Sequence, residues 1–202
     1  MGSGTALPGR DWNHSVFHYR MSGWLTRSIV IFVLFFQGAP IALPDQIQSI
    51  RLTSPNFAQG TPIPAKFTCD GNNHSPHLDW QRKPEGTQSF ALIMEDPDAA
   101  NGIFTHWIIF NIPPTITDLP ESLPPVKKLI NADRQGTNDA GKIGYIGPCP
   151  PNGTHHYQFR LYALSEMLDL NPGIKREEFL KAIKGKILAI GEIQGTYRRN
   201  KS

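Results

Sequence analysis

The chain has 202 residues, 39% of them apolar, which is enough for one sizeable hydrophobic core and leaves little for a second domain. Its 20 basic and 17 acidic residues are interspersed, and the formal net charge of +3 is too small to indicate a nucleic-acid-binding protein. Gly and Pro number 18 each, and so many turn-forming residues favour short strands joined by loops. A single β-rich domain is therefore expected.

Residues 21–46 have the order of a secretory leader: a basic start, an apolar run over 29–36 and then a stretch rich in small residues. The apolar run is shorter than the roughly 20 residues that a membrane-spanning helix needs. We therefore expect export to a periplasm or out of the cell, with an uncleaved membrane anchor as the alternative, because Pro40 adjoins the candidate cleavage sites. Residues 1–20 have no assigned role, and the folded domain is expected over 47–200.

The first half of this domain predicts edge strands followed by a buried strand. Residues 47–66 contain alternating apolar side chains interrupted by prolines, which is typical of edge strands and loops. The run 90–94 is continuously apolar, as expected of a strand covered on both faces, and it is followed by Asp96 and Asp98. Carboxylates are therefore expected at the rim of a sheet.

Two more strands are predicted over 106–111 and 157–164. Side chains alternate between the two faces of a strand, so one face should carry His155, Tyr157, Phe159 and Leu161.

Near the C-terminus, residues 176–188 place Phe179, Ile183 and Ile187 at helical spacing, which predicts one short amphipathic helix. Residues 187–197 predict a returning strand. The fold class is therefore mainly β, with minor helix.

Two clusters of polar residues precede the predicted strands. Asp96 and Asp98 come before His106, and a proline-rich loop over 147–153 delivers His155 and His156 to another strand. If these two strands are neighbours, His106 and His155 can face one cavity. His156 should point to the opposite face.

Other kinds of site fit the sequence poorly. Residues 136–142 match the glycine and lysine spacing of a phosphate-binding loop, but Ile143 stands where the metal-binding Ser or Thr should be. The two cysteines and the candidate histidines show no short-spaced pair of zinc ligands. No Gly-x-Ser-x-Gly elbow of a hydrolase occurs. Neither a metal nor a cofactor is expected.

In order and detail the two clusters resemble the signatures of the phosphatidylethanolamine-binding protein family, in its bacterial Raf-kinase-inhibitor-like branch. The matching stretches are DPDA at 96–99, HW at 106–107, GPCPPNGTHHYQFRLYAL at 147–164 and CDGNNHSPHLDW at 69–80, and the resemblance runs from about Ile50 to Tyr197. It implies a β-sandwich with a large central antiparallel sheet, a smaller sheet and one or two short peripheral helices.

The resemblance also implies a rim pocket that accepts phosphate or a phospholipid-like head group. Carried over by position, the pocket comprises Asp96, Asp98, His106, Pro150, Pro151, His155 and Tyr157. The sequence departs from the family at Ala100, where proline is usual, and near Phe104, where tryptophan is frequent.

The groups of such a pocket can bind an anion. Imidazoles, loop N–H groups and the tyrosine hydroxyl can donate to phosphate oxygens, while a carboxylate orients a histidine or receives an ammonium group. Neighbouring carboxylates are expected to raise a histidine pKa and favour the cationic form. Binding without catalysis is the leading function. Inhibition of a kinase or protease through protein contact is the alternative, a hydrolase is a third possibility, and a homodimer is left open.

Cys69 and Cys149 are the two cysteines of the chain. An exported protein meets an oxidising environment, so we expect a disulfide between them, with two unpaired thiols as the alternative. The bond would close a long loop and stabilise the fold by about 4 kcal/mol in the chain-entropy model.

Overall fold

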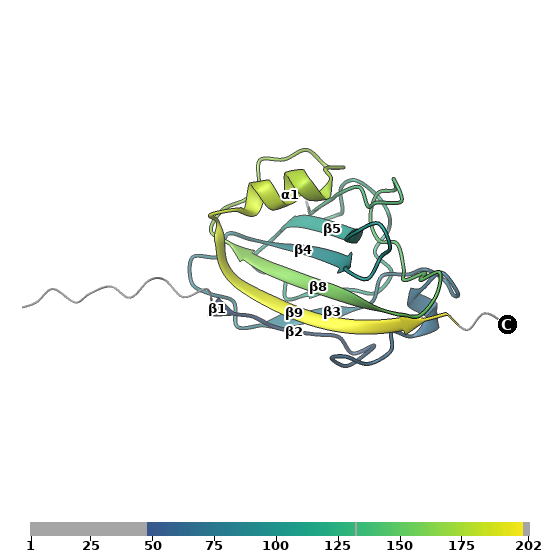
Figure 1. Cartoon of the computed structure of the whole chain (residues 1–202). Coiled ribbons are helices and arrows are strands. Elements are labelled where there is room, and N and C mark those ends of the chain that lie inside the picture. Colours follow the sequence, from purple (N-terminus) through teal and green to yellow (C-terminus); the bar gives the residue numbers. More distant parts are fainter. Residues whose placement is uncertain (1–47, 132, 200–202) are drawn as a thin grey trace, which may run out of the picture. The chain divides into compact units, whose positions relative to one another are not determined.

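The computed structural model describes residues 48–131 and 133–199. The predicted leader over 21–46 and the extension over 1–20 lie outside these described residues. Within them, strands dominate and confirm the expected mainly β class (Figure 1). No helix in this part of the chain is long and apolar enough to cross a membrane.

Two sheets form the domain. The six-stranded sheet has the order β1-β9-β8-β4-β5-β7, and the three-stranded sheet has the order β2-β3-β6. The larger sheet consists of β1 (Gln48–Ser49), β4 (Ser89–Asp96), β5 (Phe104–Ile112), β7 (Arg134–Gln135), β8 (Thr154–Leu164) and β9 (Ile187–Arg198). The smaller sheet consists of β2 (Arg51–Thr53), β3 (Leu78–Gln81) and β6 (Asp118–Leu119).

The resemblance implied an antiparallel central sheet, and the structure corrects this at one edge. Gln48 and Ser49 of β1 pair in parallel with Ala189 and Ile190 of β9, so the large sheet is mixed. The other ladders of this sheet are antiparallel, including the long pairing of β8 with β9.

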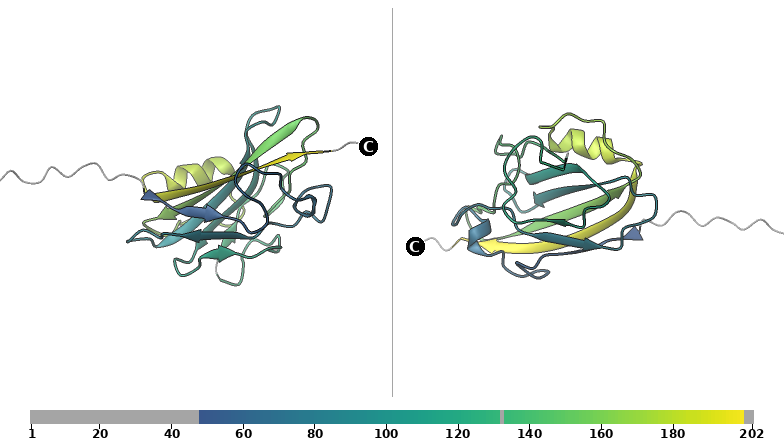
Figure 2. Two further views of the ribbon diagram at one scale, coloured as in Figure 1. Left: turned by 90° about the horizontal axis from the view of Figure 1, so that it is seen from below. Right: turned by 180° about the vertical axis from the view of Figure 1, so that it is seen from behind.

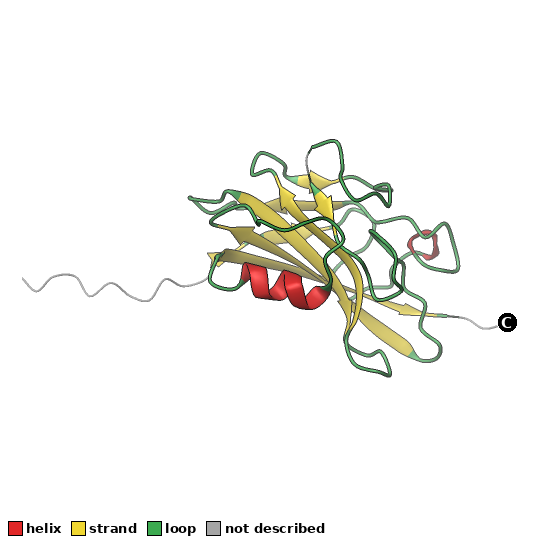
Figure 3. Cartoon of the chain, turned by 90° about the horizontal axis from the view of Figure 1, so that it is seen from above, coloured by secondary structure: helices red, strands yellow, loops and turns green. Residues whose placement is uncertain are grey.

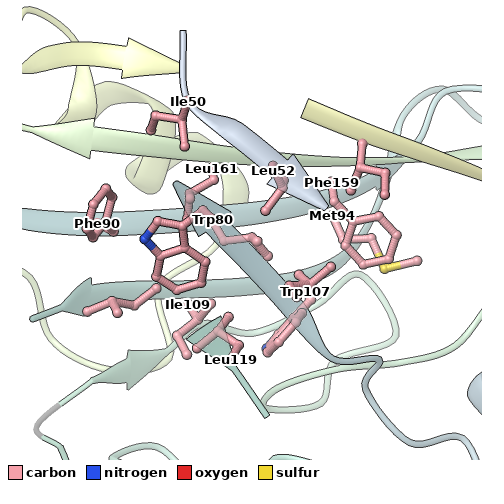
Figure 4. Close-up of a cluster of buried hydrophobic side chains, with 14 of the residues drawn as sticks. Ile50, Leu52, Trp80, Phe90, Met94, Trp107, Ile109, Leu119, Phe159 and Leu161 are labelled. Carbon is pink, nitrogen blue, oxygen red and sulfur yellow. The ribbon is translucent and has the colours of Figure 1, made fainter. Parts of the chain in front are cut away.

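The main core lies between the two sheets. Figure 4 shows Leu52, Trp80 and Leu119 of the small sheet facing side chains of the large sheet. Among the latter, Phe159 and Leu161 of β8 confirm the predicted alternation.

A second apolar cluster covers the other face of the large sheet. Helix α1 (Arg176–Ile183) lies against this face, as Figure 3 shows. It packs there through Phe179 and Ile183. Every residue of β4 is buried because this central strand is covered on both sides. The predicted helical position of Ile187 is wrong: Gly185 has a φ of +79°, which interrupts the helical path, and Ile187 begins β9.

The short 3₁₀ helix η1 (Ala65–Phe67) lies beside the C-terminal end of β9 (Figure 2, right). Asp70, which follows η1, accepts a hydrogen bond from Tyr197 Oη at 2.8 Å and one from Arg199 Nε at 2.9 Å. These contacts fix the segment that contains Cys69 against the sheet.

Candidate ligand-binding site

A β-bulge in β5 turns His106 toward the core side of the sheet. Met94 of β4 pairs with Trp107, and the next residue, Glu95, pairs with Thr105, so His106 is left without a partner on β4. Such an extra residue breaks the strict alternation of side chains. The imidazole consequently lies 5.2 Å from the ring of Tyr157, measured between ring centroids.

The backbone of Ile146 holds His106 from two sides. Its N–H donates to the His106 carbonyl at 3.0 Å, and its carbonyl lies 2.7 Å from His106 Nδ1. A carbonyl oxygen can only accept, so Nδ1 carries a proton and donates it. This leaves Nε2 as the lone-pair atom of the neutral ring.

Burial lowers the pKa of His106 below its usual value of 6.5, despite the opposing effects of the Ile146 carbonyl and the Asp96 charge. The expectation that nearby carboxylates raise a histidine pKa is therefore wrong for this residue. Near neutral pH, His106 is an uncharged acceptor at Nε2.

The second imidazole of the site pairs with a carboxylate. His155 Nδ1 lies 2.7 Å from Asp96 Oδ2, and both side chains are nearly inaccessible to solvent. The other oxygen of Asp96 accepts the backbone N–H of Asp98 at 2.9 Å. An ionised Asp96 is acceptor-only, so His155 donates through Nδ1 and keeps Nε2 for another partner.

Tyr157 packs against both imidazoles from the strand that carries His155. Its ring is stacked on that of His155 with the centroids 6.5 Å apart, and the residue is completely buried. Its Oη has no hydrogen-bond partner within 48–131 and 133–199. Burial, reinforced by the charge of Asp96, raises the pKa of Tyr157, so the hydroxyl keeps its proton.

Asp98 belongs to a neighbouring contact and does not line the pocket, contrary to the sequence-based expectation. Its Oδ2 accepts hydrogen bonds from the backbone N–H of His156 at 2.8 Å and from His156 Nδ1 at 2.7 Å. The hydrogen bond from the His156 side chain is the main cause that lowers the pKa of Asp98. As predicted, His156 points away from the pocket; with Asp98 it ties the β4–β5 connection to β8.

The loop over 146–151 lies beside these side chains and forms another part of the site. The segment after η1 holds this loop in place. A disulfide joins Cys69 to Cys149, as expected, and Cys69 N–H donates to the Pro148 carbonyl at 3.1 Å. Gly147 N–H donates to Asn73 Oδ1 at 2.6 Å. A Cβ at position 147 would lie 2.4 Å from the Phe67 carbonyl oxygen, so only glycine fits.

The resulting cavity has a volume of about 240 Å³ and contains five of the seven residues predicted for the pocket. Its lining comprises Asp96, Ala99, Ala100, Phe104, His106, Ile146, Gly147, Cys149, Pro150, Pro151 and His155. Both positions that depart from the family pattern, Ala100 and Phe104, lie on its wall.

The loop offers an anion fewer hydrogen-bond donors than expected, because Pro150 and Pro151 carry no N–H. The N–H of Cys149 makes no hydrogen bond within the described residues, so it is free to donate to a ligand.

The two histidines meet across a strand. The condition stated for a shared cavity, that β5 and β8 are neighbours, is not met, because the two strands flank β4 on its two sides. Both histidines nevertheless line the same cavity. The contribution of Ile146 was missed because a backbone carbonyl leaves no signal in the choice of side chain. Within the described residues, no group of three or more His, Cys, Asp or Glu side chains is placed to hold a metal ion.

The model of the family described as phosphatidylethanolamine-binding protein matches residues 53–198. The chain belongs to this family. Among its relatives, a UPF0098 protein of Methanothermobacter thermautotrophicus is 50% identical over 137 residues, which cover 68% of this chain and 91% of that protein. A UPF0098 protein of Aquifex aeolicus is 45% identical over 175 residues, covering 85% of this chain and 97% of the relative.

Solved structures of the phosphatidylethanolamine-binding family share the fold. The Chlamydia trachomatis protein CT736, described as a homolog of phosphatidylethanolamine-binding protein, is 38% identical, with a TM-score of 0.70 over 76% of this chain and 99% of that one. YbcL of Escherichia coli, described as a member of the mammalian family, is 34% identical with a TM-score of 0.70, over 75% of this chain and 99% of its own.

Proposed function

We propose that the His106 and His155 cavity binds a small molecule that carries a phosphate or a similar oxyanion, without turning it over. One observation carries this proposal: two imidazoles line the same cavity while both of their Nδ1 atoms are already bound to protein acceptors. Each ring therefore has its Nε2 left for a ligand. The cavity volume of about 240 Å³ suits a small ligand.

The two rings would treat a phosphate differently. Neutral His106 accepts a hydrogen bond at Nε2, which a singly protonated phosphate can donate. His155 in its imidazolium form donates from Nε2, while Asp96 balances its charge. Cys149 N–H is a second donor, and the two prolines and Phe104 supply apolar contacts for the remainder of the ligand.

We expect the His155→Ala variant to bind phosphorylethanolamine at least about tenfold more weakly than the wild type, because a charge-assisted hydrogen bond contributes about 1.5–3 kcal/mol. Calorimetric titration measures this directly. His156→Ala is the matched control, since it removes the adjacent imidazole that faces away from the cavity, and its affinity should stay within about twofold of the wild type. An equal loss of affinity in both variants would show that His155 does not contact the ligand.

Affinity in the wild type should rise as the pH falls from 7.5 to 5.5. The lowered pKa of His106 keeps its ring neutral and its Nε2 an acceptor over most of this range, while a phosphate monoester gains, below about pH 6, the proton that Nε2 can accept. The added proton therefore strengthens the His106 contact. The His106→Ala variant should lose part of this pH dependence in the same titration, and an unchanged slope would contradict the role of His106.

Turnover is the competing outcome of this experiment. A histidine paired with a carboxylate is also the geometry of a general base, so phosphate release from phosphoester substrates should be measured alongside binding. Sustained release that disappears in the His155→Ala variant would favour a hydrolase. Inhibition of a kinase or protease stays a prediction from the family resemblance.

We also propose that the domain is exported. The disulfide between Cys69 and Cys149 is compatible with an oxidising compartment. After fractionation of cells that produce the full chain, we expect the protein outside the cytoplasm and without thiols that react under denaturing, non-reducing conditions. Recovery in the cytosol with two reactive thiols per chain would overturn this proposal.

A further inference from the structure

A second and larger cavity lies between β6 and the segment that leads from β6 to β7. Its volume is about 410 Å³, and none of its lining residues lines the His106 and His155 cavity. Most of the wall is apolar and includes Ile116, Leu119, Leu123, Val126, Leu129 and Ile130. Because Asp133 also lines it, we call it the Asp133 cavity.

Asp133 is an unusual residue in such an apolar wall. It is only 4% exposed, and its Oδ1 has no hydrogen-bond partner in the described part of the chain. A buried carboxylate oxygen without a partner is costly, and native proteins rarely keep one without a reason. The backbone carbonyl of Asp133 accepts a hydrogen bond from Leu129 N–H at 3.0 Å, but any residue could supply that carbonyl.

The wall of the Asp133 cavity is tied to the core by Gln135. Its Nε2 donates to the carbonyls of Pro124 at 2.7 Å and Val126 at 2.9 Å, and its Oε1 accepts from Trp107 Nε1 at 2.8 Å. Both the nitrogen and the oxygen of this buried amide are therefore hydrogen-bonded, and they fix the segment that leads from β6 to β7. The cavity is therefore preformed, which reduces the cost of ordering a site on binding.

We propose that the Asp133 cavity is a second binding site, for a small apolar primary amine whose ammonium group pairs with Asp133. The apolar wall accommodates the hydrocarbon part, while the buried carboxylate of Asp133 selects a cationic donor. A neutral or anionic molecule of the same shape would leave Asp133 without a counter-charge.

None of the other described charged residues near the cavity is placed to pair with the ammonium group as Asp133 is. Asp118 of β6 also lines it but is half-exposed, with its carboxylate 3.7 Å from Nε2 of His77. Lys128 lies on the wall as an exposed residue and makes no ion pair within the described residues. Arg134 turns away and donates to the carbonyl of Leu170 at 2.5 Å.

Binding should depend on pH through Asp133. Burial raises the pKa of this carboxyl group to about 6, so it is largely neutral at pH 5 and largely ionised at pH 7.5. An alkylamine stays protonated over this range. We therefore expect its affinity to increase about tenfold from pH 5 to pH 7.5, the opposite direction from phosphate binding.

The test uses n-hexylamine as the probe and hexanol as its uncharged counterpart, with dissociation constants from two-dimensional NMR titration of the whole protein. We expect saturable hexylamine binding, with hexanol at least about tenfold weaker. Asp133→Asn should weaken hexylamine binding about tenfold or more, whereas Asp118→Asn, which removes the same charge from the exposed edge, should cost less than about threefold.

Several results would overturn the proposal. Wild-type protein that shows no saturable binding, equal affinity for hexylamine and hexanol, or no dependence on pH would each exclude the proposed pairing, whatever the variants do. Displacement of hexylamine by saturating phosphate, or its loss in the His155→Ala variant, would place the amine in the other cavity. Hexylamine binding that persists with phosphate present supports the second site even if the cavity with His155 has another function.

Discussion

The double variant Cys69→Ser, Cys149→Ser is expected to lose about 4 kcal/mol in the free energy of unfolding, which urea denaturation measures. The disulfide joins residues 80 positions apart, so in the unfolded chain it closes a long loop and restricts the number of accessible conformations. Cys149 also lies in the wall of the ligand cavity. Phosphorylethanolamine binding should therefore weaken when the covalent tie is cut.

Reduced wild type is the control for this experiment. If loss of the bond is responsible, wild-type protein unfolded in the presence of a reductant should have the same midpoint as the double variant, which should not respond to the reductant. Equal midpoints for oxidised wild type and the variant would show that the disulfide contributes nothing to stability.

The variant Asp133→Asn is expected to be more stable than the wild type near neutral pH. The folded-state pKa of Asp133 is about 6, against an ordinary value of 3.8, so folding opposes ionisation of this group. Between these values the folded protein binds more protons than the unfolded chain, and stability falls as the pH rises. Asparagine does not ionise, so its advantage should grow by about 2.5 kcal/mol from pH 4 to pH 7.5.

Urea unfolding at the two pH values measures this difference, and Asp118→Asn is the matched control. Asp118 lies at the edge of the same cavity, where solvent screens its charge, and its replacement should change stability by less than about 1 kcal/mol at both pH values. A constant difference between Asp133→Asn and wild type would mean that Asp133 ionises as freely in the folded state as in the unfolded chain.

Much of the site could be predicted because its residues follow the simple period of a strand. His155 and Tyr157 alternate with residues on the other face of β8, and this places His156 outside the pocket. The contact of His156 with Asp98, which keeps Asp98 out of the pocket as well, did not follow from this period. The position of His106 follows no such rule. On a regular strand it would lie on the opposite face from Trp107, and only the bulge beside Glu95 brings it to the cavity.

The remaining differences arise where the backbone determines the structure more than the side chains do. Ile187 fits the helical period of Phe179 and Ile183. However, Gly185 has a positive φ that interrupts the helical path before Ile187, and Ile187 is the first residue of β9. The parallel pairing of β1 with β9 joins segments from opposite ends of the domain, and nothing local in either segment indicates its direction. The tight packing at Gly147 likewise depends on carbonyls from a distant part of the chain.

Mutation at position 146 should leave the proton of His106 where it is, because every amino acid presents the same main-chain carbonyl there. A single base change in that codon removes the isoleucine side chain and keeps the acceptor. His155 lacks this protection, since one substitution at Asp96 deletes the acceptor for its Nδ1–H. Substitutions during evolution should therefore change the protonated nitrogen of His155 more readily than that of His106. The tautomer of His106 is set by the main chain of a loop and not by a side chain.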